Sequence, residues 1–318
     1  MHKNPVWLHT GLAGDSSTVR ASVGTLVRLG LLHMKMTAAP RTAYLLLPGG
    51  CLGKCAFCPQ WVDEARLARL RWPLVDVNSV VRGQGLFERI CIQSTLRRGF
   101  SSEVESLASL FRGPVSISIN PVHRDILQRL RRYAERIGIG LDAMSPTVFR
   151  RVNKPGSWNS YIKFIENAIN VFGRGRVHVH LIAGMGESLE EATHIMSSLY
   201  GMGAEVALFS FTPVPRTPME SHPKPDIRYY RQLQVIRYFL SEGIPIEEIK
   251  SYDPDEYREA FLTSGCPSCN RPFYNESPKG PIYNFPGMDL LKGDWEKVRE
   301  EVMTAIGDLR VHPRGKVR

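Results

Sequence analysis

Short apolar runs alternate with longer amphipathic stretches along most of the chain. The apolar runs predict buried strands at residues 42–48, 89–94, 115–120, 139–144, 177–183 and 205–211. The amphipathic stretches predict helices at residues 74–84, 101–111, 123–137, 158–172, 188–201 and 226–242. Such alternation is typical of an α/β protein, and six units predict a partial (β/α)6 TIM-type barrel.

Two segments flank this barrel. Residues 1–36 contain an amphipathic stretch and predict an N-terminal helical segment that covers one end of the barrel, which itself occupies residues 37–222. Residues 223–318 are rich in Pro, Gly and aromatic residues after their first helix. They predict an ordered C-terminal extension that lies over the barrel mouth.

The composition limits the classes of function. A chain of 318 residues with 43% hydrophobic residues suffices for one large core. No apolar run is long enough to span a membrane, and charges and glycines interrupt the first thirty residues, so we expect a cytoplasmic protein without a signal peptide. The net charge of +10 favours an acidic partner but is equally typical of a basic solvated surface. Arginines do not alternate with aromatics, which disfavours nucleic acid.

Three of the six cysteines lie together immediately after the first predicted strand. Cys51, Cys55 and Cys58 fall where barrel enzymes carry their chemistry, at the carboxyl ends of the strands. Disulfides are not expected in a reducing compartment, and the segment is short enough to wrap one small inorganic cluster. Three thiolates would bind three irons of a cubane and leave the fourth iron open. No fourth Cys or His lies close by in sequence to complete a zinc site.

The spacing Cys51-x3-Cys55-x2-Cys58, with Phe57 before the last cysteine, resembles the signature of the radical S-adenosylmethionine (radical SAM) superfamily. The resemblance implies that the three cysteines bind a 4Fe-4S cluster and that Phe57 lies beside the cofactor. It also implies that S-adenosyl-L-methionine binds the open iron. An electron from a donor such as ferredoxin or flavodoxin would then cleave it to a 5′-deoxyadenosyl radical.

Residues 140–152, 181–188 and 211–220 resemble the biotin synthase branch of that superfamily. By this resemblance, Asp142 would bind the ribose hydroxyls or lie near the substrate. The turn containing Gly184, Gly186 and Glu187 would pass close to the adenosyl group. Biotin synthases have Asn two residues before the aspartate, where this chain has Gly140, so their substrate contacts cannot be assumed.

The other cysteines bear on the type of reaction. Cys91 occupies the position of one ligand of the auxiliary cluster in biotin synthases, whose other two cysteines have no counterpart here. An extension folded over the mouth would add Cys266 and Cys269, and the three would hold an auxiliary iron-sulfur cluster. The candidates for a further ligand are Ser264, Ser268, Asn270 and Arg271. The alternatives are a buried apolar Cys91 and a small zinc or structural CxxC site.

Two opposed clusters resemble the arrangement in lipoyl synthases. The usual sequence pattern of those enzymes is absent, and the chain looks more like the archaeal two-component type. This resemblance implies sulfur insertion into an unactivated C–H bond of an octanoyl group on an acidic carrier protein, with a second radical SAM subunit as partner. Two alternatives stay open. One is another biotin synthase-like radical enzyme, such as a mutase, cyclase or methylase, and the other is a non-catalytic iron-sulfur or zinc binding module.

Overall fold

One eight-stranded sheet organises the computed structural model, which describes residues 17–309. Its strands, in spatial order, are β10 (Glu205–Ser210), β9 (Val177–Ala183), β8 (Arg136–Asp142), β7 (Val115–Ser118), β6 (Arg89–Gln93), β2 (Thr42–Leu46), β1 (Thr18–Ala21) and β5 (Leu74–Asp76). The first six are mutually parallel, whereas β1 pairs antiparallel with both β2 and β5. The six predicted barrel strands and their order are therefore confirmed.

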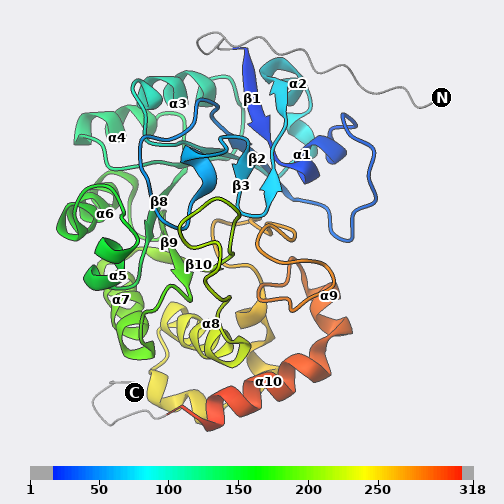
Figure 1. Ribbon diagram of the computed structural model, residues 1–318, viewed down its shortest axis with the longest axis vertical. Coiled ribbons are helices and arrows are strands. Elements are labelled where there is room, and N and C mark those ends of the chain that lie inside the picture. The colour runs from blue at the N-terminus through cyan, green and yellow to red at the C-terminus, as the bar shows by residue number, and fades with distance from the viewer. Residues whose placement is uncertain (1–16, 310–318) are drawn as a thin grey trace.

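The helices that connect the parallel strands, together with α8 after the last strand, cover the outer face of the sheet (Figure 1). They are α2 (Val77–Arg82), α3 (Phe100–Ala108), α4 (Arg124–Leu130), α5 (Pro146–Arg151), α6 (Trp158–Phe172), α7 (Leu189–Met202) and α8 (Ile227–Glu242). Alternation along each strand explains this packing, because successive side chains point to opposite faces of a sheet. On β2, for example, Ala43 and Leu45 join the main core, while Tyr44 and Leu46 belong to a smaller cluster with Trp72.

The amino-terminal prediction is wrong in part. Residues 18–21 form strand β1 instead of a helix, and only α1 (Val23–Arg28) is helical in the described part of residues 1–36. Val19 and Ala21 are fully buried, so strand pairing with β2 and β5 outweighs the helical pattern. Residues 1–16 lie outside the described residues. Likewise, the predicted helix at residues 74–84 begins as strand β5, and α2 starts only after the capping residue Asp76.

The sheet is open, because among residues 17–309 no strand pairing joins β10 to β5. The C-terminal extension occupies this opening. Ser264 Oγ accepts a hydrogen bond from the Leu208 amide of β10 at 2.8 Å, and Thr42 Oγ1 of β2 donates to the Ser268 carbonyl at 2.9 Å. Thr42 is the first residue of β2. The cysteine-bearing part of the extension thus lies at the amino ends of the strands and not over the mouth, which corrects the prediction for this part. The extension reaches the mouth further along the chain, where the Phe273 carbonyl accepts a hydrogen bond from Arg69.

The remainder of the extension packs beside the barrel. Its helices are α9 (Met288–Gly293) and α10 (Trp295–Gly307), and Figure 1 shows α10 alongside α8. The buried Arg231 of α8 joins the two, because its Nε lies 3.0 Å from a carboxylate oxygen of Glu301. In the described part of the chain, no helix has the length and apolarity that a membrane crossing requires.

Candidate active site

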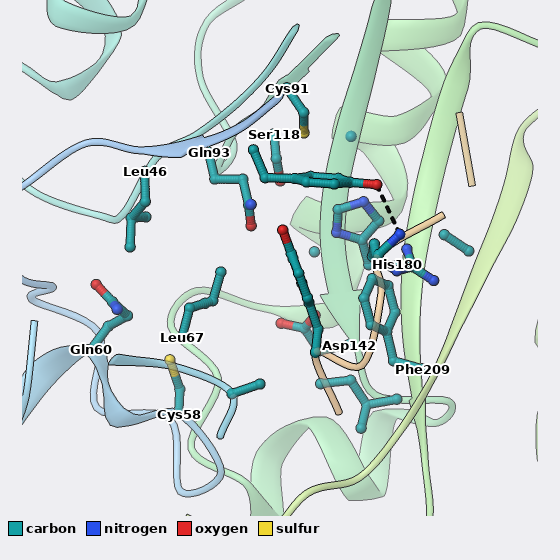
Figure 2. A pocket seen from close by; sticks show the side chains of 18 of the residues that line it. Leu46, Cys58, Gln60, Leu67, Cys91, Gln93, Ser118, Asp142, His180 and Phe209 are labelled. Carbon is teal, nitrogen blue, oxygen red and sulfur yellow. Dashed lines mark hydrogen bonds between the residues drawn. The ribbon is translucent and has the colours of Figure 1, made fainter. Parts of the chain in front are cut away.

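The interior of the partial barrel is a cavity of about 290 Å³ and is not a filled core. Alternate strand positions line it: Thr42, Tyr44 and Leu46 on β2, Cys91 and Gln93 on β6, Ser116 and Ser118 on β7, Gly138, Gly140 and Asp142 on β8, His180 on β9, and Phe209 on β10. Barrels of this type usually fill these positions with branched apolar residues. Here glycine, serine and other polar residues leave space, and Figure 2 shows Gln93, Ser118, Asp142 and His180 around it.

The first cysteine triad, Cys51, Cys55 and Cys58, lies at the carboxyl ends of the strands and lines the cavity. Two neighbouring segments hold the loop that carries it. The Leu52 amide donates to the carbonyl of Leu96, beyond β6, at 2.7 Å. The Ala56 amide donates to the Val152 carbonyl, beyond β8, at 2.8 Å. These bonds hold the loop against its neighbours.

Burial affects the thiols of this triad. It raises the pKa of Cys55 to about 11, and the positive charge of Lys154 opposes that effect. It raises the pKa of Cys58 to about 12. Because a bound metal requires the thiolate, the protein needs nearby positive charge to hold these sulfurs deprotonated. An iron-sulfur cluster and Lys154 would both supply that charge.

Asp142 and Lys154 form a buried ion pair beside the first cysteine triad. The ammonium contacts the carboxylate directly, and the two side chains are 7% and 15% exposed for Lys154 and Asp142 respectively. Burial lowers the pKa of Lys154, but the charge of Asp142 outweighs it, so the pKa is raised and the ammonium stays charged. Asp142 has φ of 63°, at a bulge that aims its side chain into the cavity.

The second cysteine triad, Cys91, Cys266 and Cys269, lines the same cavity toward the amino ends of the strands. Cys91 projects inward from the middle of β6. Ser116 Oγ lies 3.3 Å from Cys266 Sγ, and the Tyr44 hydroxyl lies 3.6 Å from Cys269 Sγ. Burial, followed by the charges of Cys266 and Cys269, raises the pKa of Cys91 well above its ordinary value. The predicted grouping of these three cysteines is consistent with this placement.

The four candidates for a further ligand lie in different surroundings. The side chains of Ser264, Ser268 and Asn270 are each engaged in hydrogen bonds to other groups. Arg271 alone among the four lines the cavity, where its Cζ lies 3.8 Å from the ring centre of Phe209. Arg271 is therefore the candidate that faces the second cysteine triad from the cavity side.

The glycine turn after β9 lies beside the cavity and does not line it. The Glu187 carboxylate accepts hydrogen bonds from the amides of Gly184 and Met185 at 2.6 and 3.0 Å. A side chain on Gly186 would meet the guanidinium of Arg151, and its φ of 97° also favours glycine. These contacts give the turn a structural role, and adenosyl binding by Gly184, Gly186 and Glu187 stays a prediction.

Several residues of the site escaped the sequence reasoning. Lys154 lies in a loop without a recognisable motif, and Tyr44 reads as an ordinary core residue of a strand. A usable signal was the alternation of side chains along the strands, which places Gln93 and Ser116 on the interior face. The same alternation put His178 and His180 on one face of their strand. Burial, together with the charge of Arg271 and offset in part by Asp142, lowers the pKa of His180 to about 4.

Neither triad forms a single-ion site as arranged. Within residues 17–309, no three His, Cys, Asp or Glu side chains converge on a position that one metal ion would occupy. A cubane has a different requirement, because its cysteines bind separate iron atoms at different corners.

A parallel-stranded partial barrel with a cysteine triad after its first strand defines a scaffold for cluster-based chemistry. The sequence model of the Radical SAM superfamily matches residues 45–199, which contain that triad and Cys91. The chain thus contains a Radical SAM superfamily domain. This membership implies a 4Fe-4S cluster and S-adenosyl-L-methionine as cofactors and supports a radical SAM enzyme.

Several solved structures are similar to part of the chain, and HydG is similar enough to show a related fold. HydG, a maturase of the FeFe-hydrogenase, matches with a TM-score of 0.52 and 10% identity over 64% of this chain and 49% of its own. Methylornithine synthase (PylB) matches with a TM-score of 0.49 and 14% identity over 61% of this chain and 62% of its own. A radical SAM methyltransferase from Sphaerobacter thermophilus matches with a TM-score of 0.47 and 16% identity, over 65% of this chain and 66% of its own. The chain thus spans about half to two thirds of these structures' lengths. No curated protein matches the chain significantly.

Proposed function

We propose that this chain is a radical SAM enzyme that inserts sulfur into an unactivated C–H bond, as a lipoyl synthase component acting on an octanoylated carrier protein. One observation carries the proposal: two separate cysteine triads line a single cavity. An enzyme that only generates a radical needs one triad, whereas sulfur insertion needs a sulfur source that faces the same substrate.

The first cysteine triad fits a 4Fe-4S cluster. Its three thiols offer three ligands, and its loop is held by backbone hydrogen bonds to neighbouring loops. When bound, the cluster with S-adenosyl-L-methionine supplies a 5′-deoxyadenosyl radical. Phe57 lines the mouth beside the triad and would exclude water from the reacting groups. The Lys154 ammonium, held by Asp142, would offset negative charge there.

The second cysteine triad fits an auxiliary iron-sulfur cluster. The donor set is three thiols with Arg271 on the cavity side, and the loop bearing Cys266 and Cys269 is fixed in place. Arg89 Nε donates to the Pro267 carbonyl at 3.0 Å, next to Cys266. When bound, such a cluster would supply sulfur for transfer to the substrate.

The wall between the triads suits an acyl chain. Leu46, Phe209 and Tyr274 contribute apolar and aromatic surface to the lining. A chain that enters from the mouth would pass the first triad and end near the second. Its apolar carbons would gain by leaving water for this surface. We infer further that a ferredoxin or flavodoxin supplies the electron and that a second radical SAM subunit completes the reaction.

The proposal is tested by anaerobic reconstitution with iron and sulfide, followed by assay of an octanoylated carrier protein with and without candidate companion subunits. Cys269→Ala should retain reductive cleavage of S-adenosyl-L-methionine but give no thiolated product. Cys58→Ala should lose both activities. If the wild type binds one cluster per chain and Cys269→Ala behaves like it, another biotin synthase-like radical reaction replaces sulfur insertion.

A further inference from the structure

A short hairpin lies at the rim of the cavity mouth. Its strands are β3 (Arg66–Leu67) and β4 (Leu70–Arg71), and they follow the first cysteine triad in the chain. Leu67 and Ala68 line the cavity, and Figure 2 shows Leu67 beside Cys58. Arg69 Nε donates to the Phe273 carbonyl at 3.0 Å, which ties the hairpin to the C-terminal extension. The hairpin is therefore a fixed part of the entrance.

Three arginines converge on one buried carboxylate at this rim. Oxygen Oδ2 of Asp63, whose side chain is 6% exposed, lies 3.5 Å from Arg66, 3.0 Å from Arg71 and 3.4 Å from Arg216. Arg216 comes from the loop after β10, so the contacts join two walls of the mouth. The side chains of Arg71 and Arg216 are 62% and 64% exposed. We name Arg66, Arg69, Arg71 and Arg216 the rim arginine patch.

The patch carries an excess of positive charge. The single carboxylate of Asp63 is shared by the guanidinium groups of three arginines. Arg69, which does not contact Asp63, brings a fourth guanidinium group to the patch. Of the neighbouring acids, Glu64 pairs with Arg20 at 2.6 Å, whereas Glu220 accepts a hydrogen bond from the Arg216 amide at 2.6 Å and so adds a second carboxylate beside the patch. The four guanidinium groups still outnumber the two carboxylates. An ion pair that served only to stabilise the buried carboxylate of Asp63 would need one arginine, whereas three are present. The surplus faces solvent, where it attracts anionic groups.

We propose that the rim arginine patch is the docking surface for an acidic protein that carries the substrate on a flexible side-chain arm. This inference rests on the proposed function for the nature of that arm. Docking on Arg71 and Arg216 would hold the carrier above the hairpin, and the apolar tip at Leu67 and Ala68 would guide the arm past Cys58 into the cavity. Carboxylates of the partner would pair with guanidinium groups that Asp63 already orients, which reduces the entropic cost of binding.

The test measures binding apart from chemistry. The variant Arg71→Gln/Arg216→Gln leaves Arg66 on Asp63, and Arg82→Gln/Arg228→Gln is the control, because those arginines are also exposed (72% and 56%) and paired with aspartates. The probe is an unmodified acidic lipoyl carrier domain. Its Kd should rise about tenfold for the rim variant and stay unchanged for the control. The variant should also lose most of the salt dependence of binding.

Turnover separates the two proposals. A short neutral octanoyl-lysine peptide should be processed equally by wild type and rim variant, since it has no acidic surface. If binding depends on the patch but the wild type thiolates neither substrate, sulfur insertion fails and the docking surface stands. An unchanged carrier Kd in the rim variant overturns the docking surface. It is also overturned if the variant loses only flavodoxin-driven cleavage of S-adenosyl-L-methionine, because the patch then serves the electron donor.

Discussion

The Tyr44 hydroxyl lies 3.6 Å from the Sγ of Cys269, which joins the first barrel strand to the second cysteine triad. The same oxygen accepts hydrogen bonds from the amides of Asn270 and Arg271 at 3.0 and 2.9 Å. One strand residue thus fixes the backbone of the loop that carries two of the three cysteines. The position of that triad depends on β2 as much as on the extension itself.

Tyr44→Phe should loosen the second triad without affecting the first. The ring would stay packed, but two buried amides would lose their acceptor, at a cost of about 1–3 kcal/mol. We expect the variant to lose the iron of the second triad after reconstitution while still cleaving S-adenosyl-L-methionine. Iron analysis and measurement of 5′-deoxyadenosine check this.

Tyr230→Phe is the matched control, because Tyr230 is a fully buried tyrosine whose hydroxyl bonds Asn284 away from both triads. It should keep the full iron content. Equal iron in Tyr44→Phe and the wild type would show that the hydroxyl does not position the triad.

Breaking the ion pair of Asp142 and Lys154 should destabilise the protein strongly. Lys154→Met leaves the carboxylate buried without its partner, and removing one member of a buried pair costs about 3–5 kcal/mol. The free energy of unfolding, from anaerobic denaturant titration, should fall by that amount. Arg258→Met removes the pair with the exposed Asp255 and should lower the free energy of unfolding far less. If the free energy of unfolding fell equally in the two variants, the buried pair would stabilise the fold no more than the pair of Arg258 with Asp255.

Acid should destabilise the fold in part through His178. Burial, aided by the charge of Arg136, lowers the pKa of this histidine to about 3. An unfolded histidine has a pKa of about 6.5, so below that pH the unfolded state binds the proton first. The neutral His178 therefore contributes to the free energy of unfolding above a pH of about 6.5. This contribution is lost as the pH falls toward 3, by about 1.4 kcal/mol for each pH unit.

His178→Gln should therefore flatten the dependence of unfolding free energy on pH between about 6.5 and 4. His194→Gln, which changes an exposed histidine of α7, is the control for replacing an imidazole by an amide. A wild-type slope in His178→Gln would show that the ring is not held neutral in the folded protein.

The sequence was most informative where structure is local. The barrel strands are apolar runs bounded by turns, and the first triad lies within one loop, so short-range pattern and spacing sufficed. The strands β1 and β5 were missed because they are short and their burial depends on pairing with distant residues. The second triad joins β6 to a loop far along the chain. Its members could be listed from sequence, but their location at the amino ends of the strands depends on contacts such as Thr42 with Ser268.

The Lys154 and Asp142 pair shows a different limit. Asp142 was a candidate by resemblance, whereas nothing in the sequence around Lys154 marks it as buried. Lysine is almost never buried without a partner, so a lysine in the sequence is expected to be exposed. Lys154 is buried only because the fold brings the carboxylate of Asp142 to it. The rim arginine patch has the same origin, because Arg216 and Asp63 meet only in the folded barrel.

The most direct test of the account is the iron and sulfide content of the anaerobically reconstituted chain, measured with 5′-deoxyadenosine formation, in the wild type, Cys58→Ala and Cys269→Ala. The account predicts two clusters in the wild type and one in each variant, with S-adenosyl-L-methionine cleaved by Cys269→Ala but not by Cys58→Ala. An iron-free wild-type chain, or cleavage that persists in Cys58→Ala, would contradict it.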